Sequence, residues 1–412
     1  MSERRAQPSR RLHPQRGFTL VELMVAVTLS LLIVLALLTL LINVNRNQAE
    51  LARTNSVIEN GRMAQQLVAA DLGHAGFWGG YVPTFDDLSI AGDAGTANSA
   101  TTVAFPTALP DPCAAVSTWN TDYKAGLIGI PLQVYEVSAT GDSPVCSGII
   151  TPAVAQPNSD VLVVRHAAPC VASASAGDPE CLNTAGNMFF QLSRCPNDAA
   201  TWILSATAAD LALKDATCTA AAPLYRFTST IYWVRNYFIT PGDSVPTLVR
   251  TRFQLAGGSL GHQQTETLVD GVQALRLQLA VDNVSKPATA GGTGTALNTA
   301  SFQRDVGWSS TSDRYTPTNR GDGNADTYLT CADAAAPCSD PAQGPFNLAN
   351  TVAVTVGILA RAGSPTPGYV DAKTYSLAGS TVAPFNDHFK RHVYTDAIRL
   401  NNVSMRREVP PP

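Results

Sequence analysis

Cysteine is the most reactive side chain in this 412-residue sequence, and the chain carries eight of them. No two cysteines stand in the C-x-x-C spacing on which zinc sites usually draw. An even number of spaced cysteines is typical of disulfides in an oxidising compartment, with free buried thiols as the alternative. The pairing stays open, although two short gaps (Cys170 to Cys181, Cys331 to Cys338) favour sequence neighbours. The disulfide candidates are Cys113, Cys146, Cys170, Cys181, Cys195, Cys218, Cys331 and Cys338.

A serine stands in a pattern that serves catalysis in other proteins. Residues 257–261 read Gly-Gly-Ser-Leu-Gly and match G-x-S-x-G, in which a strained strand-to-helix turn exposes a nucleophilic serine. Here a strand-like segment follows the motif, so the glycines favour a hairpin loop. We therefore expect no catalysis at Ser259 and a protein that is not an enzyme.

Oxygen-bearing side chains alternate in the segment GDGNADTYLTCAD. Asp322, Asn324 and Asp326 have the spacing of calcium ligands, and Asp333 falls at the twelfth position of such a loop. The sixth position is Thr327, where calcium loops usually need glycine for a sharp turn. A solvated acidic loop is the favoured interpretation, calcium is the alternative, and no other cofactor is expected.

Two further short patterns are weak evidence for a functional site. His388 and His392 lie four residues apart, but their segment is strand-like, which places them badly for one shared metal ion. We expect both to be surface residues. The tripeptide Arg-Gly-Asp at residues 320–322 is short enough to occur by chance.

Charge is distributed unevenly along the chain. The net charge is −4, and the first 17 residues carry five Arg and one Glu, so the remainder carries −8 (−4 minus +4). A mildly acidic chain without a basic patch gives no support for nucleic-acid binding. The hydrophobic content of 45% is sufficient for a buried core, and the low charged content of 15% is typical of exported proteins.

An apolar segment near the N-terminus is long enough to cross a membrane. Residues 18–42 form a run of 25 residues in which Glu22 is the only charge, and as a helix they would reach about 37 Å. The Arg-rich leader places the N-terminus in the cytoplasm and the rest outside. No small-residue cleavage site follows the apolar run, so we expect it to be retained.

The junction before the apolar run, Arg-Gly followed by Phe-Thr-Leu-Val-Glu-Leu, resembles the class III signal of type IV prepilins. The resemblance implies that a prepilin peptidase cuts between Gly17 and Phe18 and methylates the new amine of Phe18. It also implies that Glu22 pairs with this amine on a neighbouring subunit, which sets subunit registry. A carboxylate within a membrane helix costs about 2.5–3.5 kcal/mol, so it needs a partner or a task. A solvated Glu22 and a plain signal anchor are the alternatives.

The helical pattern continues past the membrane without proline, which predicts one helix over residues 18–73 with Gly61 as its weak point. Glycines in the following segment end the helix. The predicted organisation is a leader, a membrane and filament-core helix, an amphipathic periplasmic helix and a globular head. Their bounds are 1–17, 18–42, 43–80 and 81–412.

Strand patterns in the head predict an antiparallel sheet packed on the helix, and therefore an α+β, type IV pilin-like fold with long disulfide-bonded loops. The Gly, Ser, Thr and Ala-rich stretches 88–104 and 287–301 are expected to be surface loops. The predicted strands are Asp160 to His166, Thr230 to Ile239, Thr247 to Leu255, Thr267 to Asp282, Thr351 to Arg361 and His392 to Asn401.

Residues 62–79, 268–282 and 394–403 resemble PilW-type minor pilins and the J-type pseudopilins of type II secretion. The resemblance implies a minor pilin that primes pilus assembly near the filament tip, first in the inner membrane and then at the cell surface. Its implied partners are other minor pilins, the major pilin, a tip adhesin, the prepilin peptidase and the inner-membrane platform protein. The alternatives are a J-type pseudopilin, or a membrane-anchored exported enzyme or adhesin that uses Ser259 or the calcium loop.

Overall fold

A computed structural model describes residues 17–83, 105–287, 291–303, 307–310, 317–331 and 337–405. The chain divides into two compact units, Met1–Arg53 and Thr54–Pro412. The loop predicted over residues 88–104 lies outside the described residues.

The long helix predicted near the N-terminus is present as α1 (Leu20–His74). It ends where Gly76 takes a positive φ of 74° and its N–H bonds to the carbonyl of Arg165. Glycine adopts this left-handed conformation without the steric cost that a Cβ brings. The glycine-rich segment therefore stops the helix, as the sequence predicts.

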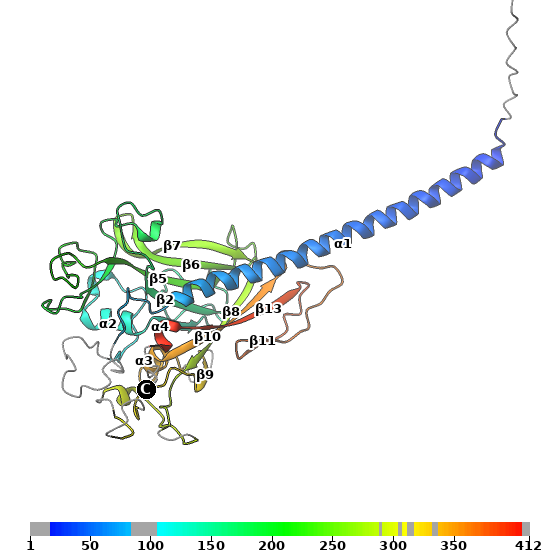
Figure 1. Cartoon of the computed structure of the whole chain (residues 1–412). Helices are drawn as coiled ribbons and strands as arrows, with labels where there is room; N and C mark the ends of the chain where they lie inside the picture. The colour runs from blue at the N-terminus through cyan, green and yellow to red at the C-terminus, as the bar shows by residue number, and fades with distance from the viewer. Residues whose placement is uncertain are drawn as a thin grey trace, which may run out of the picture. The chain divides into compact units, whose positions relative to one another are not determined.

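A seven-stranded antiparallel sheet forms one layer of the head within the described residues. The strands β1, β2, β5, β3 and β4 follow one another in that order, and β6 and β7 extend the sheet from β5. Figure 1 shows β5, β6 and β7 running side by side. The strand bounds are β1 Leu132–Glu136, β2 Asp160–Ala167, β3 Phe189–Leu192, β4 Trp202–Ser205, β5 Leu224–Arg235, β6 Thr247–Ala256 and β7 Ser259–Asp270.

A second antiparallel sheet has the strand order β13-β10-β8-β9. A small hairpin of β11 and β12 lies in the excursion between β10 and β13. The bounds are β8 Val272–Val281, β9 Thr327–Thr330, β10 Thr351–Arg361, β11 Tyr375–Leu377, β12 Ser380–Val382 and β13 Arg391–Arg399. Short helices complete the head: α2 Thr121–Gly129, α3 Gly344–Ala349 and α4 Asn401–Ser404.

Polar side chains at the start of β2 fasten the two sheets together. The hydroxyl of Ser159 accepts a hydrogen bond from the N–H of Leu275 at 3.0 Å, and the carboxylate of Asp160 accepts one from the N–H of Leu277 at 2.7 Å. The guanidinium of Arg276 donates to the same carboxylate at 2.8 Å. These buried groups satisfy one another and fix β8 against β2.

The second half of α1 packs on the head through one stripe of small and aliphatic residues. Its buried members are Val57, Gly61, Ala64, Val68 and Leu72, spaced three or four residues apart. A Cβ at position 61 would overlap the ring of Tyr394 in β13. Gly61 was predicted as a weak point of the helix, and the structure adds its physical reason, because the missing side chain makes room for this ring.

Two strand predictions were wrong in their extent. The strand predicted from Thr230 to Ile239 is β5, which begins at Leu224 and ends at Arg235. The segment from Thr267 to Asp282 was predicted as one strand, but it contains the end of β7 and all of β8, separated at Gly271. Gly271 has a φ of 73°, and a Cβ there would come within 2.6 Å of the carbonyl oxygen of Arg361. The chain therefore turns at this glycine instead of running on. The short strands β1, β3, β4 and β9 were not predicted.

All eight cysteines form disulfides, and they pair consecutively along the chain, the first with the second, the third with the fourth and so on. The bonds close loops with sequence separations of 33, 11, 23 and 7 residues. The α+β, pilin-like fold with an antiparallel head and disulfide-bonded loops is thus confirmed. The four pairs are Cys113–Cys146, Cys170–Cys181, Cys195–Cys218 and Cys331–Cys338.

Candidate functional site

The Gly17–Phe18 junction lies directly before α1. The side chain of Phe18 is 89% exposed, and a Cβ at Gly17 would meet no atom within 4 Å. The peptide bond between the two residues is therefore free of neighbours in the described chain. The leader residues 1–16 lie outside the described residues, so cleavage and methylation here stay predictions.

Glu22 takes part in a capping box at the first turn of α1. Its carboxylate accepts hydrogen bonds from the N–H of Thr19 at 3.0 Å and from the hydroxyl of Thr19 at 2.9 Å. The N–H of Glu22 in turn donates to that hydroxyl at 3.3 Å. Such reciprocal bonds satisfy N–H groups that have no partner within a helix. The sequence analysis missed this task of Glu22, although the signal T-x-x-E is visible at residues 19–22.

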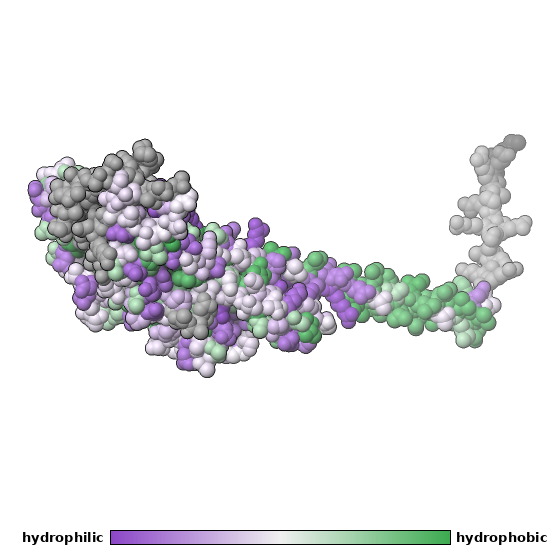
Figure 2. All heavy atoms as spheres, turned by 90° about the horizontal axis from the view of Figure 1, so that it is seen from below, coloured by the Kyte–Doolittle hydropathy of each residue, from purple (hydrophilic) through white to green (hydrophobic). Residues whose placement is uncertain are grey.

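The following turns of α1 present an apolar surface. Large hydrophobic side chains from Leu20 to Val44 are all between 40% and 74% exposed, and Figure 2 shows them as a continuous hydrophobic band. In the part of the chain that the structure describes, this is the one helix long and apolar enough to cross a membrane. A surface of this kind is stable in lipid or against other apolar helices, but not in water.

Three polar contacts join the second half of α1 and the residues just after it to the head. The amide of Asn60 donates to the carbonyl of Asp270 at 3.0 Å. The amide of Asn402 donates to the carbonyl of Ala75 at 3.1 Å, and Asp71 pairs with His166. Asn60 and Asp71 thus hold α1 against the first sheet, and Asn402 holds the residue just after α1 against α4.

The ion pair between Asp71 on α1 and His166 on β2 is nearly buried. Nε2 of His166 lies 2.8 Å from Oδ1 of Asp71, with the side chains 4% and 14% exposed. Nδ1 of His166 contacts the carbonyl of its neighbour Ala167 at 2.8 Å. Burial lowers the pKa of His166, but the hydrogen bond and charge of Asp71 outweigh it and raise the pKa above its usual value. The pair is therefore a charged clamp between α1 and the first sheet.

The Gly-x-Ser-x-Gly segment forms a hairpin, as predicted. Gly257 and Gly258 have φ angles of 59° and 82° and connect β6 to β7, with Ala256 opposite Ser259. A nucleophile elbow instead leads from a strand into a helix. Nearby His262 bonds to the carbonyl of Ser229 at 3.1 Å, and burial lowers its pKa to about 4.

The predicted calcium ligands have other partners in the structure. The carboxylate of Asp326 accepts from the N–H groups of Asn283 and Val284 at 3.0 and 2.8 Å, and that of Asp322 accepts from the N–H of Asn324. Among the described residues, no group of three His, Cys, Asp or Glu side chains is placed to hold a metal ion. Asp333 lies outside the described residues, so calcium binding stays a prediction.

The remaining short patterns lie where the sequence suggested. His388 and His392 are both exposed, and His392 packs edge-on against the ring of Tyr394. Arg320 of the Arg-Gly-Asp tripeptide is buried and lies over the ring of Phe302 at 5.0 Å from its centroid. A surface receptor therefore has no access to this arginine.

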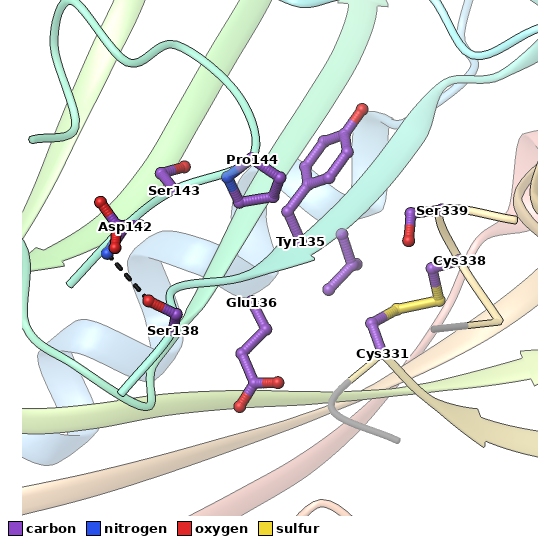
Figure 3. A pocket seen from close by; sticks show the side chains of 10 residues that line it. Tyr135, Glu136, Ser138, Asp142, Ser143, Pro144, Cys331, Cys338 and Ser339 are labelled. Atoms are coloured by element: carbon purple, nitrogen blue, oxygen red, sulfur yellow. Dashed lines mark hydrogen bonds between the residues drawn. A yellow bond between two sulfur atoms is a disulfide. The ribbon is translucent and has the colours of Figure 1, made fainter. Parts of the chain in front are cut away.

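A pocket of about 400 Å³ lies between β1 and the Cys331–Cys338 disulfide. Figure 3 shows the ring of Tyr135 and the carboxylate of Glu136 pointing away from β1 in opposite directions, with the disulfide beside them. Its polar groups already have partners, because Glu136 pairs with Arg276 and the hydroxyl of Ser138 accepts from the N–H of Asp142. This pocket offers few free groups to a ligand.

An exposed apolar helix behind a Gly-Phe junction, continued into an α+β head with antiparallel sheets and disulfides, defines a type IV pilin-like protein. Comparison with family models supports this class of protein. Residues 12–42 match the prokaryotic N-terminal methylation motif, and residues 232–402 match the type IV pilus-assembly protein W. The two matches together support a pilin of the type IV pilus that is similar to this family of pilus-assembly proteins. No curated protein and no solved structure matches it.

Proposed function

We propose that this protein is a minor pilin that helps to prime type IV pilus assembly near the filament tip. The observation that carries the proposal is the combination of the two family matches with an apolar helix whose side chains have no partner in the described chain. Such a helix is stable as a membrane anchor and, after release, among the helices of a filament core. The large disulfide-bonded head suits a position where it does not have to pack into a repeating filament wall.

In this proposal the peptidase removes the leader after Gly17 and methylates Phe18. The carboxylate of Glu22 then pairs with the amine of Phe18 on a neighbouring subunit, where the low dielectric strengthens their attraction. The partners are other minor pilins, the major pilin, a tip adhesin, the peptidase and the platform protein. The head is periplasmic before assembly and lies at the cell surface afterwards.

Deletion of the gene, with complementation by the wild-type chain, tests the function. Priming predicts that pili counted by electron microscopy fall strongly in the deletion strain and return on complementation. Secretion of exoproteins should remain normal in the same cultures. Normal pili with failed secretion would instead identify a J-type pseudopilin, and an effect on neither would contradict both assignments.

A further inference from the structure

A second pocket lies beside Arg276. It has a volume of about 460 Å³ and is lined by residues 156–158 before β2, by the start of β8 and by residues 381–385 after β12. Its size lies within the roughly 300–1,000 Å³ of small-molecule sites. Three segments that are distant in sequence thus build one concave wall.

The floor of this pocket carries a donor without a partner. Nη1 of Arg276 binds Glu136 and Asp160, each at 2.8 Å, while its buried Nε has no hydrogen bond in the described chain. This Nε has almost no accessible surface, so a ligand in the pocket does not reach it. Gln273 also lines the pocket, and its Oε1 accepts from Nη2 of Arg391, which leaves its Nε2 as a donor for a ligand.

The rim carries amides that the fold does not use. No hydrogen bond of the Gln156 or Asn158 side chain occurs among the described residues, although both line the pocket. Each amide offers an acceptor oxygen and two donors. Thr381 adds a hydroxyl on the facing segment. This set of mixed donors and acceptors matches hydroxyl groups, which both donate and accept.

An apolar wall faces these groups. Pro157 and Pro384 line the pocket with the ring of Phe385, which the guanidinium of Arg391 fixes from 3.8 Å above its centroid. A rigid aromatic ring next to amides suits a ligand that is apolar on its C–H face and polar at its edge.

Charge decides between classes of ligand. Arg276 is paired with Asp160 and Glu136, and Arg391 is paired with Asp371 and Asp387. Four carboxylates around two guanidinium groups leave no net positive charge to attract an anion. The ligand should therefore be neutral and rich in hydroxyl groups.

We propose that this pocket binds a ring of a neutral saccharide. The amide of Gln273 holds one edge of the ring, the amides of Gln156 and Asn158 hold its hydroxyls, and Phe385 stacks on its C–H face. The site is separate from the helix that anchors and assembles the chain.

A printed array tests the proposal with the full-length, detergent-solubilised protein. It carries neutral hexose and N-acetylhexosamine oligosaccharides beside sialylated ones and acidic peptides. The test variant is Gln156→Ala with Asn158→Gly, because glycine tolerates the φ of 55° at position 158. The matched control is Gln254→Ala with Ser244→Gly, and both positions lie outside the pocket. Ser244 has a positive φ of 58°, so its change to glycine matches that of Asn158.

We expect neutral saccharides to bind, and the test variant to weaken the apparent affinity about tenfold through lost hydrogen bonds. The control should bind as wild type, and both variants should support normal piliation, which separates this site from the assembly function. Binding by sialylated saccharides or acidic peptides alone, no binding at all, or equal binding by the test variant would overturn the proposal.

Discussion

The two units of the chain satisfy their polar side chains in opposite ways. In the described part of the first unit, Met1–Arg53, hydroxyls bond only within their own helix, as Thr28 does to the carbonyl of Val25 at 2.9 Å. In the second unit, Thr54–Pro412, buried charges join segments far apart in sequence. These pairs include Asp71 with His166, Asp160 with Arg276 and Asp371 with Arg391.

The difference shows which part of the molecule is made to change surroundings. Under the proposed function, a helix whose hydroxyls bond only to its own carbonyls can leave the lipid and enter a filament without breaking these hydrogen bonds. A head that depends on buried long-range pairs must keep them, because removing one partner leaves an unpaired charge. Variants in each unit should therefore fail in different assays.

The largest effect on assembly is expected from Glu22→Gln in the first unit. Glutamine can still close the capping box with Thr19, but it carries no charge for the amine of Phe18. We expect the amount of the protein in sheared pili to fall by about tenfold or more, which corresponds to about 1.4 kcal/mol. Immunoblots of sheared pili, normalised to total protein, measure the amount of the variant that enters pili.

The control is Ser30→Ala, which removes a hydroxyl that bonds only within its own helix at 2.7 Å to the carbonyl of Ala26. This variant should enter pili as wild type does. Normal incorporation of Glu22→Gln would show that the carboxylate serves only as a cap.

Asp71→Ala in the second unit should lower the free energy of unfolding by about 3 kcal/mol, since it leaves buried His166 without its partner. Chemical denaturation of the full-length protein in detergent measures the loss. Asp396→Ala changes an exposed residue of β13 and should stay within about 0.5 kcal/mol. Equal losses in the two variants would mean that the clamp between α1 and β2 contributes nothing.

Gly61→Ala should cost about 2 kcal/mol, because the added Cβ overlaps the ring of Tyr394. Gly73→Ala is the matched control within the same helix, where a Cβ meets no atom within 4 Å. The higher helix propensity of alanine should make that variant more stable by about 0.5–1 kcal/mol. Thermal unfolding distinguishes the two, and a stabilising Gly61→Ala would contradict the described packing.

The smallest effect concerns pH. The pKa of His166 is raised in the folded protein, so its stabilisation is complete below its unfolded value of about 6.5 and is lost as pH rises through the folded value. Burial raises the pKa of Asp160 to about 6, which acts in the same direction. Asp160 acts at pH values up to about 6, where His262, whose pKa is lowered to about 4, acts in the opposite direction. The free energy of unfolding should therefore fall as pH rises above about 6.5, and less so in His166→Gln. If the free energy of unfolding of the wild-type protein did not change with pH in this range, the prediction would be contradicted.

Local patterns allowed the helix and the larger strands to be predicted. The apolar run, the missing prolines and the β-branched segments act over a few residues, so α1, β2, β6 and β10 lie close to their predicted bounds. The split at Gly271 was missed because its cause is the carbonyl of Arg361, which is 90 residues away. The Asp71–His166 clamp depends on tertiary contact in the same way, and no local signal marks it. The capping box of Thr19 and Glu22 is local and could have been found.

The central claim is that the chain is a prepilin, and the mass and first residues of the protein extracted from membranes test it most directly. The account predicts a mature chain that begins with methylated Phe18, and accumulation of the uncut chain in a Gly17→Glu variant. The apolar helix should remain in the mature protein. An uncut wild-type chain that begins at Met1, or a cut beyond Ile42, would contradict the account.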